Sequence, residues 1–205
     1  LCDKDEFKIK KIREEGIVLE NIIESTTVFD KVYDAVSEMR YLDLDYLVFS
    51  LKTYQTLGAA KEAEVLNSDK ITLISAQNGI DSEKLISAVF GESKTLRMVI
   101  NYAGNLRSPN TVRVSFVTPP NYIGSMDDSR TKQAEVFAGL LNSVGFKTQK
   151  LDSFDLVKSS WEKTILNSSL SALCGVGRLT MSEAMADTDT LELVEQIINE
   201  GIDVA

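Results

Sequence analysis

Three polar side chains recur at helical spacing in the C-terminal part of the chain. Lys163, Asn167 and Ser171 stand at positions i, i+4 and i+8, a spacing that places them on one face of an α-helix. An ammonium, an amide and a hydroxyl group together suit a small substrate that carries carbonyl, hydroxyl and carboxylate groups. The same spacing describes a solvated helix surface equally well, and spacing alone favours that simpler interpretation.

Three further polar clusters each follow a short apolar run in the middle of the chain. The runs are residues 45–50, 71–76 and 95–101, which are typical of strands buried on both faces. The carboxyl ends of parallel strands meet at one edge of a sheet, where ligands commonly bind. One Asn-Gly pair is only a turn signal, but three polar clusters in succession favour a ligand site. The clusters are Lys52-Thr53-Tyr54-Gln55, Gln77-Asn78-Gly79 and Asn101–Asn105.

The composition excludes several kinds of chemistry. The 205 residues include no histidine, so histidine triads, imidazole bases and histidine metal ligands are absent, and we expect no metal site. The net charge of −9 disfavours nucleic-acid binding. Cys2 and Cys174 are too far apart for a CxxC motif and are typical of reduced thiols in a cytoplasmic protein. No apolar run approaches the ~20 residues that a membrane span needs, so we expect no membrane partner.

The elements that would position these side chains alternate in type. Helical patterns at residues 56–66 and 82–90 separate the three apolar runs, which predicts a parallel α/β sheet. From residue 154 onward only helical patterns remain, so we place a domain boundary there, between 1–153 and 154–205. The other expected elements are helices at 6–15 and 129–144, strands at 17–19, 26–29 and 147–151, a loop at 101–109 and an edge strand at 112–117.

Five segments of the chain carry a family resemblance: DYLVFSLKTYQ at 45–55, AQNGI at 76–80, RMVINYAGN at 97–105, PPNYIG at 119–124 and WEKTILNSSLS at 161–171. Together they resemble the 2-dehydropantoate 2-reductase, or ketopantoate reductase, family. The resemblance covers essentially all of the chain, and the Trp-x-Lys…Asn helix together with the Gln-Asn-Gly turn is its most specific part. It implies a Rossmann-like sheet that binds NAD(H) or NADP(H), followed by an all-α C-terminal domain, and the reduction of 2-dehydropantoate to pantoate.

The resemblance also implies roles for individual residues. Lys163 matches the family's catalytic lysine, and an ammonium there would stabilise and protonate the oxygen of the ketone as hydride adds to the carbon. Asn167 matches a substrate-binding asparagine, whereas Ser171 stands where many members have another asparagine. Asn78 matches a residue near both nicotinamide and substrate. Lys52, with Gln55 in the same loop, matches the cofactor loop at a strand end.

The choice of cofactor depends on the residue that ends the second strand of such a domain, which is Asp3. A carboxylate at this position accepts a hydrogen bond from the ribose 2′-hydroxyl and repels a 2′-phosphate, so Asp3 favours NAD(H). Lys4 beside it weakens this preference, because an ammonium can pair with the phosphate. The Gly-rich G-x-G-x-x-G loop does not occur in the chain. We therefore expect an internal fragment, with the family's first strand before Leu1 and its last helices after Ala205.

Other functions stay open at this point. A nucleotide-binding module without turnover would also keep this fold, and the absence of the Gly-rich loop favours it. A related dehydrogenase that acts on another 2-hydroxy acid is a further alternative. The partners that we expect are a small 2-keto acid and a second copy of the chain, with a homodimer formed through the helical domain.

Overall fold

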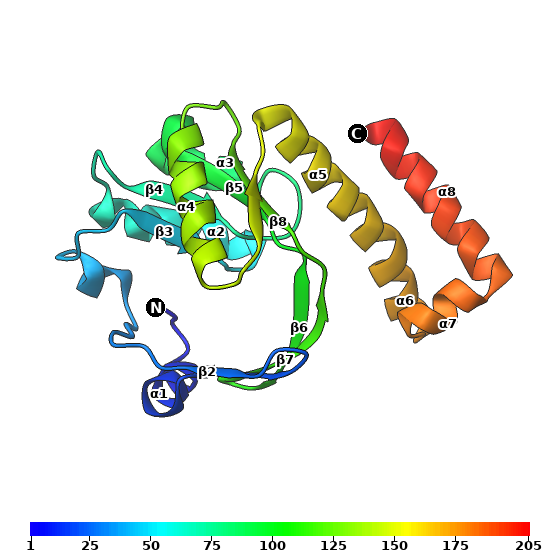
Figure 1. The fold of residues 1–205 in the computed structure, drawn as a ribbon, viewed down its shortest axis with the longest axis horizontal. Coiled ribbons are helices and arrows are strands. Elements are labelled where there is room, and N and C mark those ends of the chain that lie inside the picture. Colours follow the sequence, from blue (N-terminus) through cyan, green and yellow to red (C-terminus); the bar gives the residue numbers. More distant parts are fainter.

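A five-stranded sheet forms the centre of the computed structural model, which describes residues 1–205. Its strand order is β3-β4-β5-β8-β9 (Figure 1). β3, β4 and β5 pair in parallel, which confirms the arrangement predicted from the three apolar runs. The strands are β3 Tyr46–Phe49, β4 Thr72–Ser75, β5 Thr95–Val99, β8 Asn121–Ser125 and β9 Thr148–Lys150.

Helices cover both faces of this sheet. The crossover helices α2 (Thr53–Ala63) and α3 (Ser82–Phe90) pack on one face, and α4 (Thr131–Ser143) packs on the other. Successive strand residues therefore enter two different cores, with Leu73 on the α2–α3 side and Ile74 on the α4 side. Because both faces are covered, every residue of β4 and β5 is buried, including the charged Arg97 of β5.

β8 is a strand that the sequence pattern did not reveal. It reads Asn-Tyr-Ile-Gly-Ser, without an apolar run, and it pairs antiparallel with β5. The first residue, Asn121, is fully buried, and its side chain accepts a hydrogen bond from the Asn101 N–H at 2.9 Å and donates one to the Lys147 carbonyl at 3.1 Å. These bonds satisfy the buried amide. The sheet is therefore parallel in its first three strands and mixed as a whole.

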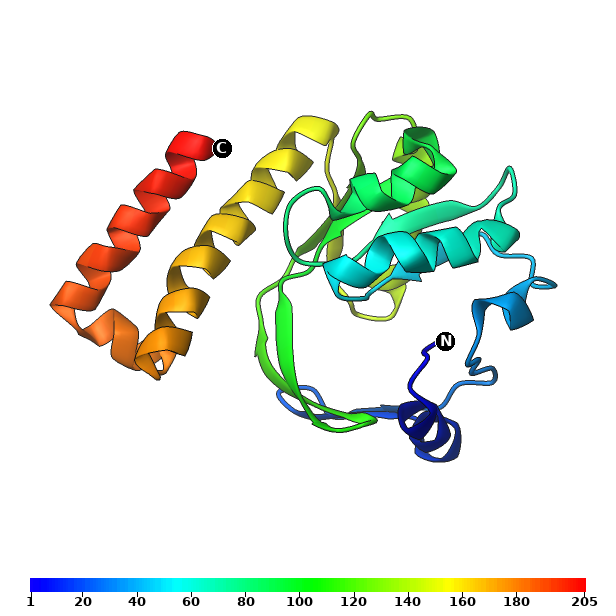
Figure 2. The ribbon, with the colours of Figure 1, turned by 180° about the vertical axis from the view of Figure 1, so that it is seen from behind.

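A second sheet, of four strands, lies below the first in Figures 1 and 2 and has the order β2-β1-β7-β6. β6 occupies the segment that the turn-like composition predicted as a loop. Its residues are mostly exposed, so polar and glycine positions carry no alternation that would mark a strand. β7 lies between β1 and β6 rather than at an edge. The strands are β1 Ile17–Asn21, β2 Ser25–Thr27, β6 Tyr102–Ser108 and β7 Thr111–Val117.

The amino-terminal helix α1 (Glu6–Glu15) lies beside this second sheet and agrees with the predicted range (Figure 1). Asp5 caps it by accepting a hydrogen bond from the Lys8 N–H at 3.0 Å, and Gly16 ends it with a φ of +75°. Three short 3₁₀ turns complete the α/β part of the chain. They are Val36–Met39, Glu64–Leu66 and Glu92–Lys94.

Every element after residue 152 is helical, as the sequence predicts. α8 runs back alongside α5, and a Cβ atom on Gly201 of α8 would lie 3.0 Å from Cγ1 of Ile165, so the two helices are in close contact (Figures 1 and 2). Each helix of the structure is too short or too polar to span a membrane. The elements are α5 Ser153–Leu166, a π-helical turn at Asn167–Ser171, α6 Ala172–Gly177, α7 Met181–Ala186 and α8 Thr188–Val204.

Candidate functional site

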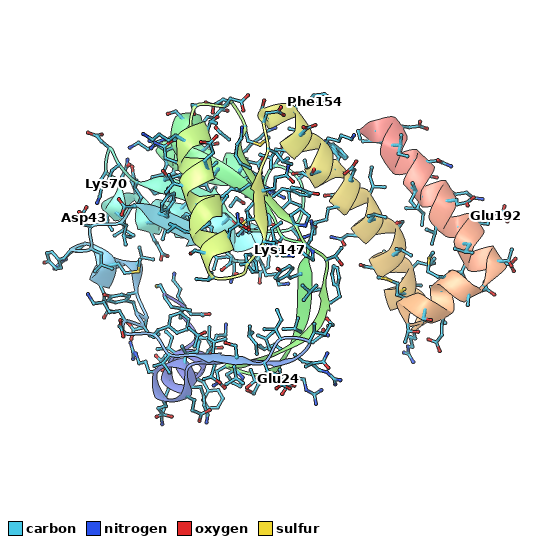
Figure 3. All side chains as sticks on the ribbon, in the orientation of Figure 1. Glu24, Asp43, Lys70, Lys147, Phe154 and Glu192 are labelled. Carbon is cyan, nitrogen blue, oxygen red and sulfur yellow. The ribbon has the colours of Figure 1, made fainter.

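The structure places the first two polar clusters and Asn101 at one edge of the central sheet, whereas the rest of the third cluster, residues 102–105, lies in β6 of the second sheet. Phe49 pairs with Ser75, and Ser75 pairs with Arg97, so β3, β4 and β5 end at nearly the same level. The loops that follow carry the candidate residues. At the opposite edge of the sheet, Lys70 forms an ion pair with Asp43 at 2.6 Å, and both residues are labelled in Figure 3.

The candidate cofactor residues of these loops are open to solvent. Lys52 is the N-cap residue of α2, Gln55 lies in the first turn of that helix, and Asn78 belongs to the turn after β4. All three side chains are exposed, and none donates or accepts a hydrogen bond within the chain. Gly79 follows Asn78 with a φ of +99°, a conformation that favours glycine and turns the chain sharply into α3. Ammonium and amide groups at this edge are therefore available to a ligand.

Lys163 reaches the same edge from α5. Its side chain is half-buried, and Nζ donates a hydrogen bond to the carbonyl oxygen of Ile100, the residue directly after β5. Burial lowers the pKa of the Lys163 ammonium, and the nearby Arg97 guanidinium lowers it further. A lysine whose pKa is lowered holds its proton less tightly than an exposed one, and this property suits a proton donor.

Asn167 and Ser171 lie beyond Lys163 in the π-helical turn, and both side chains are exposed. The predicted line of three polar residues assumed a regular α-helix. A π turn contains one additional residue, so Ser171 does not stand where a regular α-helix would place it relative to Lys163. Asn167 still lies one turn after Lys163, since its N–H donates to the Lys163 carbonyl. π turns of this kind often mark functional positions in helices.

Asp3 lies apart from this cluster. Its segment pairs in parallel with Tyr33, and its carboxylate accepts hydrogen bonds from Lys8 Nζ at 2.7 Å and from the Asp5 N–H at 3.1 Å. Burial raises the pKa of the Asp3 carboxyl, but these hydrogen bonds outweigh burial and hold it below the usual range. The neighbouring Lys4 forms an ion pair with Glu62 of α2 at 2.6 Å, so its ammonium already has a partner.

Sequence reasoning missed Arg97. This residue lies in the middle of β5, is 4% exposed, and lines a pocket of about 300 Å³ together with Ile80, Ser160 and Trp161. The pocket lies between the start of α3 and α5, next to the strand-end loops. The available signal was a single charged residue inside an otherwise apolar strand run, because a buried charge requires partners.

Comparisons with known proteins bear on the family. The family model described as "Ketopantoate reductase PanE/ApbA" matches residues 1–128, and the model described as "Ketopantoate reductase PanE/ApbA C terminal" matches residues 155–205. The chain belongs to the ketopantoate reductase family. This membership confirms the resemblance that the five sequence segments indicate.

Curated relatives carry one name. The 2-dehydropantoate 2-reductase of Streptococcus pyogenes is 24% identical over 204 residues, which cover 98% of this chain and 64% of the relative. The enzyme of the same name from Archaeoglobus fulgidus is 26% identical over 160 residues, which cover 78% of this chain and 52% of the relative. The chain thus spans less than two thirds of the length of these ketopantoate reductases.

Solved structures share the fold. D-mandelate dehydrogenase in complex with NADH and anilino(oxo)acetate superposes with a TM-score of 0.86 at 19% identity, covering 100% of this chain and 64% of that one. A 2-dehydropantoate 2-reductase from Geobacter metallireducens superposes with a TM-score of 0.82 at 21% identity, covering 99% of this chain and 65% of that one. These likenesses confirm the predicted Rossmann-like α/β fold with a helical C-terminal part.

Proposed function

We propose that the protein reduces the ketone of 2-dehydropantoate to the hydroxyl of pantoate with a reduced nicotinamide cofactor. The observation that carries this proposal is the half-buried Lys163 ammonium at the carboxyl edge of the parallel strands, where the exposed Lys52, Gln55 and Asn78 also lie. The names of the curated relatives support the same reaction. Within this function, residues 1–153 form the dinucleotide-binding domain and residues 154–205 begin the substrate domain.

The exposed donors at the strand ends fit a nicotinamide dinucleotide. Lys52, Gln55 and Asn78 offer ammonium and amide groups without internal partners, and α2 starts at the same edge with its N–H groups free of a side-chain cap. These residues would hold the cofactor. When bound, the reduced nicotinamide supplies the hydride that adds to the ketone carbon.

NADH is the cofactor that we propose. The Asp3 carboxylate repels a 2′-phosphate, and its lowered pKa keeps it charged. The ion pair between Lys4 and Glu62 supports this preference, because it withdraws the nearest ammonium from a phosphate. A solved complex of D-mandelate dehydrogenase with NADH is consistent with the same choice.

The remaining chemistry belongs to the chain's own side chains. Lys163 Nζ donates a hydrogen bond to the ketone oxygen, stabilises the negative charge that grows there, and transfers its proton to that oxygen. The carbonyl of Ile100 holds the ammonium in place before substrate binds. Asn167 and Ser171 bind the polar groups of the substrate from the π turn, and Asn78 orients the substrate from the strand-end loop.

A second candidate is a dehydrogenase for another 2-hydroxy acid. The solved structure with a TM-score of 0.86 is a D-mandelate dehydrogenase, and its ligand anilino(oxo)acetate is a 2-keto acid derivative with an aromatic group. The same proton donor would serve either substrate, because both reactions reduce a ketone next to a carboxylate.

We also propose a homodimer formed through the helical domain, where Val176 and Val204 are exposed apolar residues.

The test is a substrate panel with the full-length natural protein. Oxidation of NADH and NADPH is followed with 2-dehydropantoate, with an aliphatic 2-keto acid and with benzoylformate. We expect the highest kcat/KM with 2-dehydropantoate and NADH. A preference for benzoylformate would replace the first candidate by the second, and binding of NADH without oxidation by any acid would favour the nucleotide-binding module without turnover.

A further inference from the structure

Arg97 is a buried arginine in the centre of the molecule. Its neighbours Leu96 and Met98 enter the core on the α4 side, so the Arg97 side chain extends from the opposite face, toward α3 and α5. A guanidinium stays charged, and placing it in the interior is unfavourable unless its donors are paired. Its hydrogen bonds therefore show what it is used for.

The guanidinium connects two consecutive features of the chain. Nη2 donates a hydrogen bond to the carbonyl oxygen of Gly79, in the turn that carries Asn78. Nη1 donates to Ser82 Oγ and to Glu83 Oε2, the latter at 3.0 Å, both in the first turn of α3. The rigid planar fork of an arginine can hold these acceptors in one fixed arrangement, which a lysine cannot do.

A buried hydrogen-bond network continues from Arg97 to the next loop. Ser82 Oγ lies 2.8 Å from Ser75 Oγ, which donates to Gln77 Oε1 at 3.2 Å. Gln77 Nε2 in turn donates to Thr56 Oγ1 at 2.6 Å and to the Leu51 carbonyl at 2.7 Å. Leu51 directly precedes Lys52. The network thus connects the Asn78 turn with the loop that carries Lys52 and Gln55.

Arg97 also affects the pKa of Lys163 through its charge. The guanidinium is the one charged group that contributes, after burial, to the lowered pKa of the Lys163 ammonium. Of the charged groups at the start of α3, Glu83 pairs with Arg97 itself at 3.0 Å, and Lys84 pairs with Asp81 at 2.9 Å. On α5 itself, Lys158 and Glu162 are exposed and lie 4.0 Å apart.

We propose that Arg97 is a positioning residue of the active site, which fixes the Asn78–Gly79 turn through the Gly79 carbonyl and holds a positive charge near Lys163. This inference rests on the proposed function. Arg97 does not touch the reacting atoms. It acts through the turn, which carries a substrate-orienting amide, and through its charge, which eases proton release from Nζ.

The test compares three variants of Arg97 in the full-length protein. Arg97→Lys keeps the charge and loses the fork. Arg97→Met loses both, and the double variant Arg97→Met/Glu83→Met removes the ion pair as a unit, since a buried pair replaced by apolar residues of similar volume commonly leaves a folded protein. Arg130→Met is the matched control, because Arg130 binds the Ser93 carbonyl at 2.7 Å at the opposite edge of the same sheet.

Two measurements show whether Arg97 positions the active site or only stabilises the fold. The first is kcat and KM for 2-dehydropantoate and for NADH. The second follows acetylation of Lys163 by trace acetic anhydride over a range of pH, detected by mass spectrometry, which gives the titration midpoint of the ammonium without any turnover.

We expect kcat to fall at least about tenfold in all three Arg97 variants, because displacing a catalytic side chain by a fraction of an ångström to an ångström costs rates of this order. The KM for NADH should change little. The Lys163 midpoint should move to higher pH in Arg97→Met and in the double variant, and should stay near its original value in Arg97→Lys. The Arg130→Met control should change neither quantity.

Folded variants that retain normal kcat and an unchanged Lys163 midpoint would overturn the proposal. If Arg97→Met does not fold, the Arg97→Lys variant decides through kcat. The failure of the proposed function would be recognised separately, because the unmodified protein would then reduce no 2-keto acid while the Lys163 titration could still be measured.

Discussion

Lys163 illustrates at the residue scale how environment decides between two interpretations of one side chain. Spacing alone allowed either a catalytic lysine or a solvated helix surface. In the structure the ammonium is half-buried, bonded to the Ile100 carbonyl and close to a second positive charge. A solvated lysine has none of these three features, so the environment favours the catalytic role that we propose.

The lowered pKa of Lys163 predicts a pH dependence. A lysine that donates a proton must be charged, so kcat should fall as the pH rises through the pKa of Lys163. Because burial and Arg97 lower that pKa, the fall should begin at lower pH than the ordinary lysine value of 10.5 would give. The measurement is the pH profile of kcat at saturating NADH and substrate. A profile that stays flat up to that value would contradict the assignment.

Asp3 carries a prediction about the cofactor. Replacing it in the double variant Asp3→Ala/Lys4→Arg removes the carboxylate that repels a 2′-phosphate and adds a guanidinium, so the ratio of kcat/KM for NADPH to that for NADH should rise at least about tenfold. Steady-state kinetics with both cofactors measure this ratio. Glu6→Ala, which removes an exposed carboxylate three residues away, is the control and should leave the ratio unchanged. An unchanged ratio in the double variant would exclude Asp3 from the ribose site.

At the scale of elements, the sequence predicts best what is most deeply buried. The apolar runs at 45–50, 71–76 and 95–101 became β3, β4 and β5, and β4 and β5, which are covered on both faces, are buried at every residue. β6 and β8 escaped prediction for the opposite reason. β6 is exposed, and β8 buries an asparagine whose partners lie on distant segments.

The candidate site was likewise predictable only where a local sequence pattern marks it. Strand ends can be predicted from the runs that precede them, so the sequence predicts that Lys52 and Asn78 lie at the carboxyl edge of the sheet, where the structure has them. The π turn at Asn167–Ser171 could not be predicted, since periodicity assumes a regular helix. The role of Arg97 also depends on contacts with residues 14 and more positions away, which no local pattern contains.

Gly124 of β8 provides a test of how α5 is held against the sheet. A Cβ atom there would lie 2.7 Å from the Leu151 carbonyl oxygen and 3.1 Å from Cδ2 of the fully buried Leu156. Gly124→Ala should therefore lower the free energy of unfolding by about 1–3 kcal/mol through overpacking. Thermal and denaturant unfolding measure this change.

Gly139 is the matched control. It lies on α4, and a Cβ atom added there would have no other atom within 4 Å. Gly139→Ala should therefore raise the free energy of unfolding by about 0.5–1 kcal/mol, because alanine favours the helix over glycine. Equal effects of the two substitutions would mean that α5 does not approach the sheet as closely as the structure shows.

At the scale of the whole molecule, the parallel strands and the long helix α5 share one task. The strands bring three loops to one edge, and α5 crosses from the β8 side to that edge, where Lys163 contacts the residue after β5. In Figure 1 the helices α6, α7 and α8 lie on the far side of α5 from the sheet, with α8 alongside α5. The proposed cofactor residues and the proposed proton donor therefore come from different parts of the chain and meet only in the folded molecule.

The most direct test of this account is the turnover of the Lys163→Ala variant in the full-length protein. Oxidation of NADH by 2-dehydropantoate is compared with that of the unmodified protein and of Lys158→Ala, an exposed lysine on the same helix. The account predicts that Lys163→Ala lowers kcat at least about 100-fold with the fold intact, whereas Lys158→Ala is unaffected. A folded Lys163→Ala variant with near-normal kcat would contradict it.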